Sequence, residues 1–503
     1  MPAKTRLAKN ESADRDAFRS ASADDAQQHP VAPFPSSGHS NQAGNNQPAV
    51  WQRRQWLAWS SIAGAAVLTG CRESPSTDEA ESAPTVRTDV PLRIVWTGTD
   101  SDAETLRRTW QSISDQPLKI TVVRPPSATK FAEPPAEDAT SIWAASSKAD
   151  VVIFPLSQLG EMVSRDQIIS SLLPESGSKT APPAIRVAMT FSQETRGQCL
   201  GGSLPSLLVG EKATGKVPKS GSITWDGFEK LASEFPGQVA EPTAEGWAGV
   251  SYLWRLASVL SATWLFDRDT LEPLLTRPEY IDVLRQMVAT NKHAPDLSLT
   301  PGEIFRQVSS GQLVAGIGFP QVGNNLADSD DDSTLVGNVQ VSGLPIAEAG
   351  VANADGVILE RTGRAVFAPQ TLVGSLAASC RQTAAANQFL KWLDGGEGSE
   401  PLYRSIPGLQ HPTTSSSIDE AAGGNYHPWL RSAWQNPNVM PPLNLVGGDR
   451  YLAVLDSQIR QCLAGKQTAE EACAAIAKSW SGLHAEYGVK KQKRSWQQAI
   501  GLL

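Results

Sequence analysis

The sequence predicts an α/β fold, and two observations support this prediction. Short runs rich in β-branched and other apolar residues, at 92–96, 119–123 and 149–154, have the length of buried strands. Segments with helical spacing separate these runs and begin at about residues 101 and 157. Strands that alternate with helices form crossover units, so we expect a mostly parallel sheet covered by helices on both faces.

Capping residues mark the starts of several predicted helices. Ser101 and Glu104 have the spacing of a capping box, which predicts that the first helix begins there. Thr468 and Glu471 have the same spacing and predict the start of a helix near the C-terminus. Thr224 is a good N-cap, because its hydroxyl can accept a hydrogen bond from a free backbone amide.

A later strand, predicted over residues 314–320, carries the glycines Gly316 and Gly318. A glycine in a strand removes a side chain where another backbone or a ligand comes close, and both explanations remain open here. Residues 337–345 predict a further strand, whose exit turn leads into a possible hinge.

Residues 53–71, RRQWLAWSSIAGAAVLTGC, contain the three parts of a bacterial export signal: a positive flank, a short uncharged run and small residues at its end. The run is too short and too rich in Ser, Gly and Ala to span a bilayer securely, which needs about 20 predominantly apolar residues. Its end resembles the lipobox of bacterial lipoproteins, in which the signal is cleaved before the cysteine and the sulfur is lipidated. We predict a signal peptide at 51–71, lipidation of Cys71 and a location on the periplasmic face of a membrane. An uncleaved signal anchor or an ordinary hydrophobic helix is the alternative, and a twin-arginine export route stays open.

The segments on either side of this signal are polar. Residues 1–50 contain few bulky apolar side chains and cannot offset their chain entropy by burial, which predicts a disordered leader. A start codon assigned too far upstream explains this segment equally well. Residues 72–90 are rich in Ser, Glu, Thr and Pro, as expected of a flexible tether.

Composition and motifs narrow the class of function. A chain of 503 residues predicts two or three domains at about 100–200 residues each, and its net charge of −8 argues against nucleic acid as a partner. Histidine spacings for zinc, phosphate-binding Gly-Lys-Ser/Thr loops and Gly-x-Ser-x-Gly nucleophile elbows are missing from the sequence. We therefore predict no cofactor, no metal and no enzymatic activity. Paired carboxylates for glycoside hydrolysis stay open, because their separation is a three-dimensional quantity.

Two further groups of residues are candidates for a calcium site and for disulfides. The acidic run 328–333 lacks the glycine and the terminal glutamate of an EF-hand loop, which favours a solvated loop over a calcium site. Without Cys71, the cysteines number four, and an even number permits disulfides in an oxidising compartment. Their pairing stays open. They are Cys199, Cys380, Cys462 and Cys473.

Short motifs along the chain, in a fixed order, resemble those of the extracellular solute-binding proteins of ABC importers, of the family 1 type and with a lipoprotein anchor. The resemblance runs from about residue 91 to residue 488, and each motif alone is weak. One departure is the segment 206–218, which lacks the Tyr-Asn pair and Lys-rich helix usual in the family. The matching segments are 92–96, 149–152, 170–174, 197–205, 224–228, 305–318, 386–393 and 402–408.

This resemblance implies a type II-like periplasmic binding protein fold, in which two α/β lobes enclose a ligand cleft. We assign residues 91–223 and 310–370 to the first lobe, and residues 224–309 and 371–503 to the second. A chain that passes between lobes more than once ties them with several hinge strands, and closure about a ligand is then a hinge motion.

Two strand ends provide the first candidate ligand-binding residues. Ligands of open α/β sheets bind outside the carboxyl ends of the strands, which points to Trp96, Thr97 and Gly98 after the first strand. Gly318 and Phe319, at the end of the later strand with its two glycines, are included because a glycine leaves room for a ligand or another backbone.

Tryptophan content provides the other candidates. Fifteen tryptophans is a high number for this length, and a flat aromatic face stacks on a sugar ring while carboxylates and amides bind its hydroxyls. Glu245 and Trp247, with Tyr252 close in sequence, form the leading cluster. Core packing is the alternative for each of these rings.

Together these observations predict a lipid-anchored protein outside the cytoplasm that binds a small polar solute and delivers it to the permease subunits of an ABC transporter. A sugar or oligosaccharide is the expected solute. A surface lipoprotein that uses the same fold as a sensor or scaffold is the alternative, and a polysaccharide-active enzyme is a third possibility.

Overall fold

The computed structural model describes residues 89–124, 141–170, 181–218, 223–260, 264–321, 339–347, 364, 366–409, 413, 424–440 and 443–502. The predicted leader (1–50), the signal peptide with Cys71 (51–71), nearly all of the tether and the acidic run 328–333 lie outside these residues.

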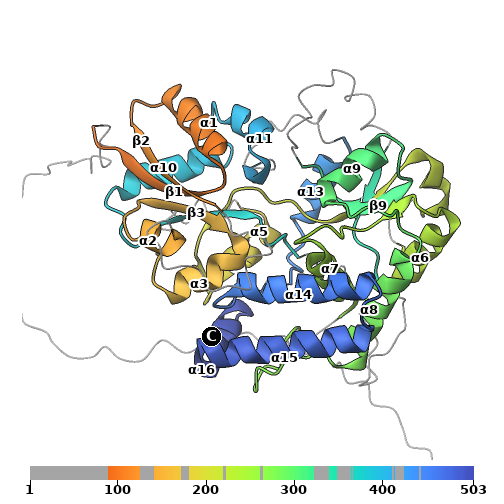
Figure 1. Cartoon of the computed structure of the whole chain (residues 1–503). Helices are drawn as coiled ribbons and strands as arrows, with labels where there is room; N and C mark the ends of the chain where they lie inside the picture. The colour runs from red at the N-terminus through yellow and green to blue at the C-terminus, as the bar shows by residue number, and fades with distance from the viewer. Residues whose placement is uncertain are drawn as a thin grey trace, which may run out of the picture. The chain divides into compact units, whose positions relative to one another are not determined.

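The first sheet confirms the three strands predicted near the start of the folded chain. β1 (Leu92–Thr97) pairs in parallel with β2 (Leu118–Val123) on one side and with β3 (Val151–Pro155) on the other. The strand order is β2-β1-β3-β11-β6, with β11 (Leu372–Leu376) antiparallel to both β3 and β6 (Gln198–Cys199). The sheet is therefore mixed rather than wholly parallel (Figure 1).

A second sheet has the order β10-β7-β9-β8. Its central strand β9 (Ala315–Gly318) is antiparallel to β7 (Ser206–Val209) and parallel to β8 (Val239–Ala240). β10 (Gln340–Ser342) completes the other edge, antiparallel to β7. The two strands predicted over 314–320 and 337–345 are thus confirmed, and both belong to this sheet, with β7 between them. A separate hairpin joins β4 (Thr190–Phe191) to β5 (Glu194–Thr195).

The distribution of strands between the sheets differs from the predicted lobe boundaries. β7, β9 and β10, which we grouped with the first lobe, form the second sheet together with β8, which we grouped with the second lobe. β11, which we grouped with the second lobe, pairs with β3 in the first sheet. A strand pattern shows that a segment needs a hydrogen-bonded neighbour, but it does not show which free edge supplies that neighbour.

Helices cover both sheets (Figure 1). They are α1 (Asp100–Gln111), α2 (Ile142–Ser146), α3 (Leu159–Ser164), α5 (Pro183–Met189), α6 (Trp225–Glu234), α7 (Ala248–Val259), α8 (Pro278–Asn291), α9 (Pro301–Ser309), α10 (Thr383–Leu393), α11 (Glu400–Ser405), α13 (Tyr426–Ala433), α14 (Gly448–Leu463), α15 (Ala469–Tyr487) and α16 (Val489–Ala499), with 3-10 turns η1 (Leu156–Gln158), η2 (Glu211–Lys216) and η5 (Pro407–Leu409).

Two of the three predicted helix starts are confirmed. The Thr224 hydroxyl accepts from the Gly227 amide at the start of α6, and Thr468 begins α15 with the predicted capping box. The first prediction was wrong by two residues. The capping box of α1 is formed by Thr99 and Asp102, because Asp102 occupies the third helical position and can reach back to the Thr99 amide.

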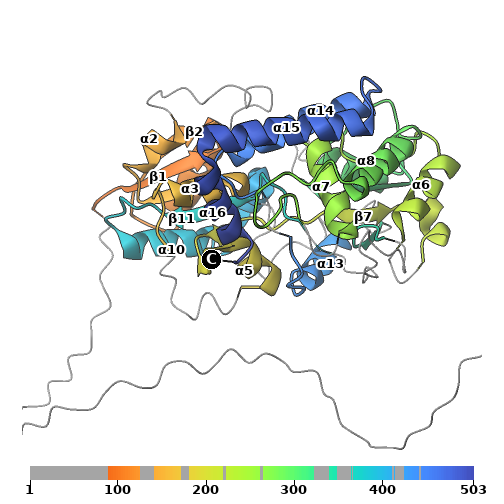
Figure 2. The ribbon, with the colours of Figure 1, turned by 90° about the horizontal axis from the view of Figure 1, so that it is seen from below.

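The buried residues form two cores that share the first sheet. Successive side chains of β1 point to opposite faces, so Ile94 and Trp96 lie in a core with α1 and α10, whereas Val95 lies in the other core. That larger core continues through the second sheet to α7, α14 and α15. α14 and α15 lie side by side as an antiparallel pair in Figure 1, and they overlap in the view of Figure 2. α14 contacts η1, which follows β3, as well as α7.

The part of the chain that the structure describes contains neither a candidate membrane span nor a candidate metal cluster. No helix in that part is long and apolar enough to cross a bilayer. No group of three His, Cys, Asp or Glu side chains in it could hold a metal ion.

Candidate functional site

The candidate site is built around three aromatic rings from separate segments. The ring centroid of Trp247 lies 6.0 Å from that of Trp254 and 5.9 Å from that of Phe319, and the Trp254 and Phe319 centroids are 6.3 Å apart. We call these residues the aromatic trio. Trp247 keeps 9 % of its surface exposed, against 1 % for Trp254 and 4 % for Phe319. Trp247 is therefore the outermost of the three rings.

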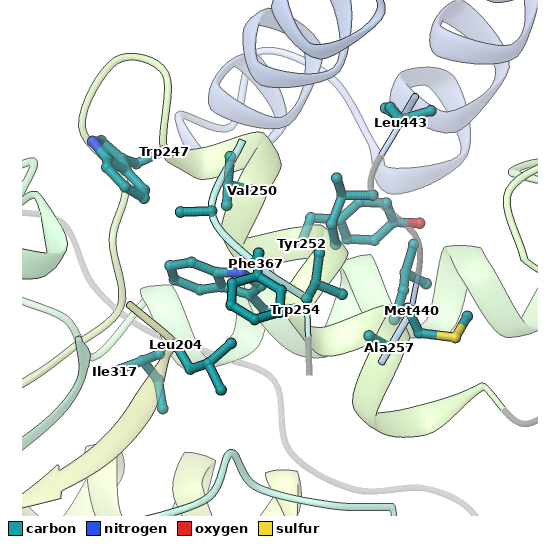
Figure 3. Packing of buried hydrophobic residues seen from close by; sticks show 14 of the residues in the cluster. Leu204, Trp247, Val250, Tyr252, Trp254, Ala257, Ile317, Phe367, Met440 and Leu443 are labelled. Atoms are coloured by element: carbon teal, nitrogen blue, oxygen red, sulfur yellow. The ribbon is translucent and has the colours of Figure 1, made fainter. Parts of the chain in front are cut away.

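Local structure explains why these rings meet. Trp247 is the N-cap residue of α7, and Trp254 follows seven residues later, so both side chains lie on one face of the helix (Figure 3). Phe319 directly follows β9, at the carboxyl end of that strand. Leu204 and Phe367, from segments that connect the two sheets, belong to the same core. The trio thus shares its core with chain that passes between the sheets.

Hydrogen bonds fix the loop that carries Trp247. The Ser251 hydroxyl donates to the Pro242 carbonyl at 2.7 Å, and the Trp247 amide donates to the Ala244 carbonyl at 2.9 Å. Gly246 has a φ of +83°, a conformation that favours glycine. Its amide donates to an Asp456 carboxylate oxygen at 3.0 Å. The loop is consequently held by its own helix and by α14.

A buried ion pair anchors the same loop at its other end. Arg255 donates through Nε to the Glu241 carboxylate at 2.8 Å, and both side chains are almost fully buried. The guanidinium carbon of Arg255 lies 4.0 Å from the ring centroid of Trp225, and its Nη2 donates to the Thr290 hydroxyl at 3.0 Å. These several partners compensate for the desolvation of the buried Arg255 cation.

The polar groups near these elements differ in their exposure and in whether they have a hydrogen-bond partner. Glu245, two residues before Trp247 in the chain, is exposed. The indole Nε1 of Trp254 and the Thr97 hydroxyl are buried without a hydrogen-bond partner among the described residues. A buried donor without an acceptor is uncommon, so both groups could donate to a bound polar molecule.

The residues predicted at the end of β1 are used mainly in packing. Trp96 is 0 % exposed and lies in the core with α1 and α10. A Cβ atom on Gly98 would lie 2.3 Å from the Trp96 Nε1, so this glycine makes room for the indole. Thr97 is also buried. The structure does not test whether these three residues touch a ligand, and that role stays a prediction.

Gly318 accommodates a close approach of two backbones. A Cβ atom at this position would lie 2.5 Å from the Pro301 carbonyl oxygen at the start of α9. The Gly318 carbonyl accepts from the Ser206 hydroxyl at 2.8 Å. Of the two explanations for this glycine, the structure shows close packing, whereas an additional role beside a ligand stays a prediction.

Tyr252 is separated from the trio by the geometry of α7. Five residues after Trp247, it lies on a different face of the helix, toward the core with α8 and α15 (Figure 3). Its hydroxyl donates to the Tyr280 carbonyl at 2.9 Å and lies 3.9 Å from the Cys473 sulfur. Burial raises the pKa of Tyr252 well above its ordinary value. The structure therefore does not bring Tyr252 together with Glu245 and Trp247.

Sequence reasoning missed two residues of this site. Trp254 is not among the predicted residues, although its spacing of seven from Trp247 is a usable helical signal. Asp456 had no usable signal, because it lies 210 residues from the Gly246 amide that it binds.

Similar architectures occur among solved structures. Maltose-bound MalE3 of T. maritima matches 78 % of this chain and 100 % of its own, with a TM-score of 0.56 at 18 % identity. The chain has the two-lobed periplasmic binding protein fold. An ABC transporter solute-binding protein from Agrobacterium radiobacter K84 in complex with ribitol gives a TM-score of 0.60 at 13 % identity, over 78 % of this chain and 99 % of that one. A cyclo/maltodextrin-binding protein complexed with maltotetraose gives 0.51 at 17 % identity, over 80 % and 99 %. No protein-family model and no curated protein matches the sequence. The binding-protein fold predicted from the sequence is thus confirmed.

Proposed function

We propose that this protein is the extracytoplasmic solute-binding component of an ABC importer, that it is anchored through a lipid on Cys71, and that its solute is a carbohydrate. The fold is shared with solved binding proteins whose bound molecules include maltose, ribitol and maltotetraose. We infer a binding role without catalysis, to which permease subunits would supply the transport step.

The aromatic trio carries this proposal. Trp247 is the most exposed of the three rings, at 9 %, and Trp254 and Phe319 pack against it. A sugar ring presents apolar C–H faces and polar hydroxyl edges, so an aromatic face with a carboxylate beside it suits both. In this proposal Trp247 stacks on the sugar and Glu245 accepts from its hydroxyls. Thr97 is the further hydroxyl group that we assign to the ligand.

The proposed mechanism is a difference in affinity between two conformations. Each lobe contains one of the two sheets, and the closed form contacts the ligand from both lobes. Ligand binding then shifts the population toward closure by the difference in its binding free energy between the two forms. We propose that the permease recognises the closed form.

A thermal-shift screen of the full-length protein tests the solute class. The panel contains maltose, maltotetraose, ribitol, single amino acids and polyamines. A ligand at 100 times its dissociation constant stabilises the folded protein by about 2.7 kcal/mol, which raises the unfolding temperature measurably. We expect a shift with a carbohydrate and none with amino acids or polyamines. The reverse pattern would refute the carbohydrate assignment.

Matched tryptophan variants test the location of the site. Trp247→Ala should abolish the sugar-induced shift, whereas Trp143→Ala should retain it. Trp143 is a suitable control because it is a partly buried tryptophan on α2, where the Arg165 guanidinium carbon lies 4.7 Å from its ring centroid. Equal loss of binding in both variants would show that the trio is not the site.

The anchor has a test of its own. We expect the expressed protein to lose residues 1–70, to fractionate with membranes and to carry a diacylglyceryl group on Cys71. Cys71→Ser should release the protein from the membrane fraction without changing sugar binding. A protein that stays membrane-bound with serine at this position would favour the uncleaved signal anchor.

A further inference from the structure

We propose that Asp456 is a positioning residue for the ligand loop: from α14 it caps the first turn of α7 and thereby sets the place of Trp247. This inference rests on the proposed function for its meaning, since Trp247 is the ring assigned to the sugar. The geometry that supports it does not depend on any ligand.

The start of α7 needs an acceptor from elsewhere in the chain. The first amides of a helix have no intrahelical partner, and they are usually satisfied by an oxygen on the N-cap side chain. The N-cap residue here is Trp247, whose side chain carries no oxygen. Local sequence therefore leaves the first turn of α7 uncapped.

Asp456 supplies an acceptor for one amide of this first turn and for one amide just before it. One carboxylate oxygen accepts from the Gly246 amide at 3.0 Å, and the other accepts from the Gly249 amide at 3.1 Å. These two amides flank Trp247 in the chain, so both sides of this residue are tied to one carboxylate. The negative charge also lies at the positive end of the α7 dipole, where it stabilises the helix.

Close packing makes this attachment rigid. A Cβ atom on Gly249 would lie 2.8 Å from the Asp456 backbone nitrogen, so the two helices touch through their backbones at this point. Arg460, one turn further along α14, donates through Nε to the Asp456 carboxylate at 3.1 Å. Asp456 itself is 5 % exposed. Its carboxylate is thus held from two sides and has little freedom to follow a loop that moves.

The same helix provides a matched control. Asp449 also lies on α14, but its carboxylate accepts from the Gln158 side chain at 2.8 Å, on η1 rather than α7. Burial raises the pKa of both aspartates above the ordinary value. Substitution of Asp449 therefore perturbs a buried carboxylate of α14 without touching the ligand loop.

The experiment measures the position of Trp247 directly. Full-length protein is labelled with 5-fluorotryptophan, and the fluorine resonance of Trp247 is assigned from its loss in Trp247→Phe. We expect Asp456→Ala to move or broaden this resonance without ligand, and Asp449→Ala to leave it unchanged. Asp456→Asn should restore part of the original position, because its amide oxygen can still accept one of the two hydrogen bonds.

Affinity for maltotetraose gives the second readout. Loss of two hydrogen bonds to a charged acceptor should weaken binding by about tenfold or more in Asp456→Ala, if the loop carries the sugar contact. An unmoved Trp247 resonance in Asp456→Ala would overturn the positioning role. A moved resonance in a protein that binds no sugar would instead support the positioning role and count against the proposed function, so the two failures are distinguishable.

Discussion

Two places in this chain put a tryptophan beside a glycine just before a helix, and they use the ring in opposite ways. At the end of β1, Trp96 belongs to the strand and points into the core with α1 and α10, fully buried. Before α7, Trp247 lies outside any strand and keeps 9 % of its surface exposed, two residues after the exposed Glu245. The comparison shows that a residue within a strand must direct its side chain to one face of the sheet. A residue in a loop before a helix is not restricted in this way.

The anchoring ion pairs of the two regions also differ. On β1, Arg93 binds Asp150 with a 2.7 Å contact, and the Arg93 side chain is 31 % exposed. On α7, the side chain of Arg255 is 0 % exposed and that of its partner Glu241 is 7 % exposed. The loop that carries Trp247 is therefore attached to an interior charge pair, and its anchors should be more costly to remove.

The largest expected effect separates the two tryptophans by stability. Trp96→Ala should lower the free energy of unfolding by about 3–5 kcal/mol, because a fully buried indole leaves a cavity. Trp247→Ala should cost less, since its ring lies at the edge of the trio. Urea unfolding of the full-length protein measures both. Equal losses, or a larger loss at Trp247, would break the contrast between the two regions.

Removal of one cation from each ion pair is expected to have the next largest effect. Arg255→Met should cost about 3–5 kcal/mol, because it leaves the Glu241 charge buried without its partner. Arg93→Met should cost about 1–3 kcal/mol, since the Asp150 carboxylate still accepts from the Arg381 amide at 3.0 Å. The same urea titration gives both values, and the proposed order fails if Arg93→Met is the more damaging change.

Acidification should affect the two regions at different pH. His484 lies on α15 and packs against Phe266 and Tyr451. Burial lowers the pKa of His484 to about 4. The unfolded chain takes up this proton at about pH 6.5, so the free energy of unfolding falls by about 2–3 kcal/mol as the pH drops from about 6.5 to 4. The Arg93 hydrogen bond keeps the pKa of Asp150 below its ordinary value despite burial, so that its stabilisation is present above about pH 3.9 and lost below it.

The measurement is urea unfolding at several pH values between 7 and 3. His484→Phe should flatten the loss between pH 6.5 and 4, and Asp150→Asn should flatten only the loss below about pH 4. If His484→Phe leaves the upper part of the curve unchanged, another group must cause it.

The smallest expected effect concerns thiols. All four cysteines of the described chain are free, and Cys199, Cys462 and Cys473 are buried, whereas Cys380 is partly exposed. Desolvation raises the pKa of Cys199 and of Cys473 to about 12, which suppresses their reactive thiolate. We expect Cys380 to react first with a thiol reagent in the native protein, as mass mapping of the labelled peptide would show. Faster labelling of Cys199 or Cys473 would contradict the burial described here.

Local patterns predicted much of the secondary structure and only part of the site. The β1 strand followed from its run of apolar and β-branched residues, and the starts at Thr224 and Thr468 followed from capping chemistry. Capping chemistry also failed once, at α1, where Thr99 rather than Ser101 is the N-cap. Two acceptable capping residues two positions apart cannot be separated by pattern alone, since both satisfy the same spacing rule.

The site shows the limit of the sequence more clearly. Trp247 and Phe319 were both proposed, but nothing in their patterns indicated that their rings lie within 6 Å of each other. Tyr252 looked like a neighbour of Trp247 because they are five residues apart, yet five residues turn a helix by more than a third of a revolution from the first position. Sequence distance therefore misled for Tyr252, where helical phase decides which residues share a face.

For this protein the sequence determined the elements and the class of fold, because periodicity, caps and chain order act over a few residues at a time. Only the tertiary structure decided that β9 and β10 join one sheet and β11 the other, and that Asp456 caps a helix more than 200 residues earlier in the chain. Pairing of strand edges and capping from another helix depend on which free hydrogen-bonding groups meet after the chain has folded. Such long-range contacts cannot be recognised from a local pattern in the amino-acid sequence.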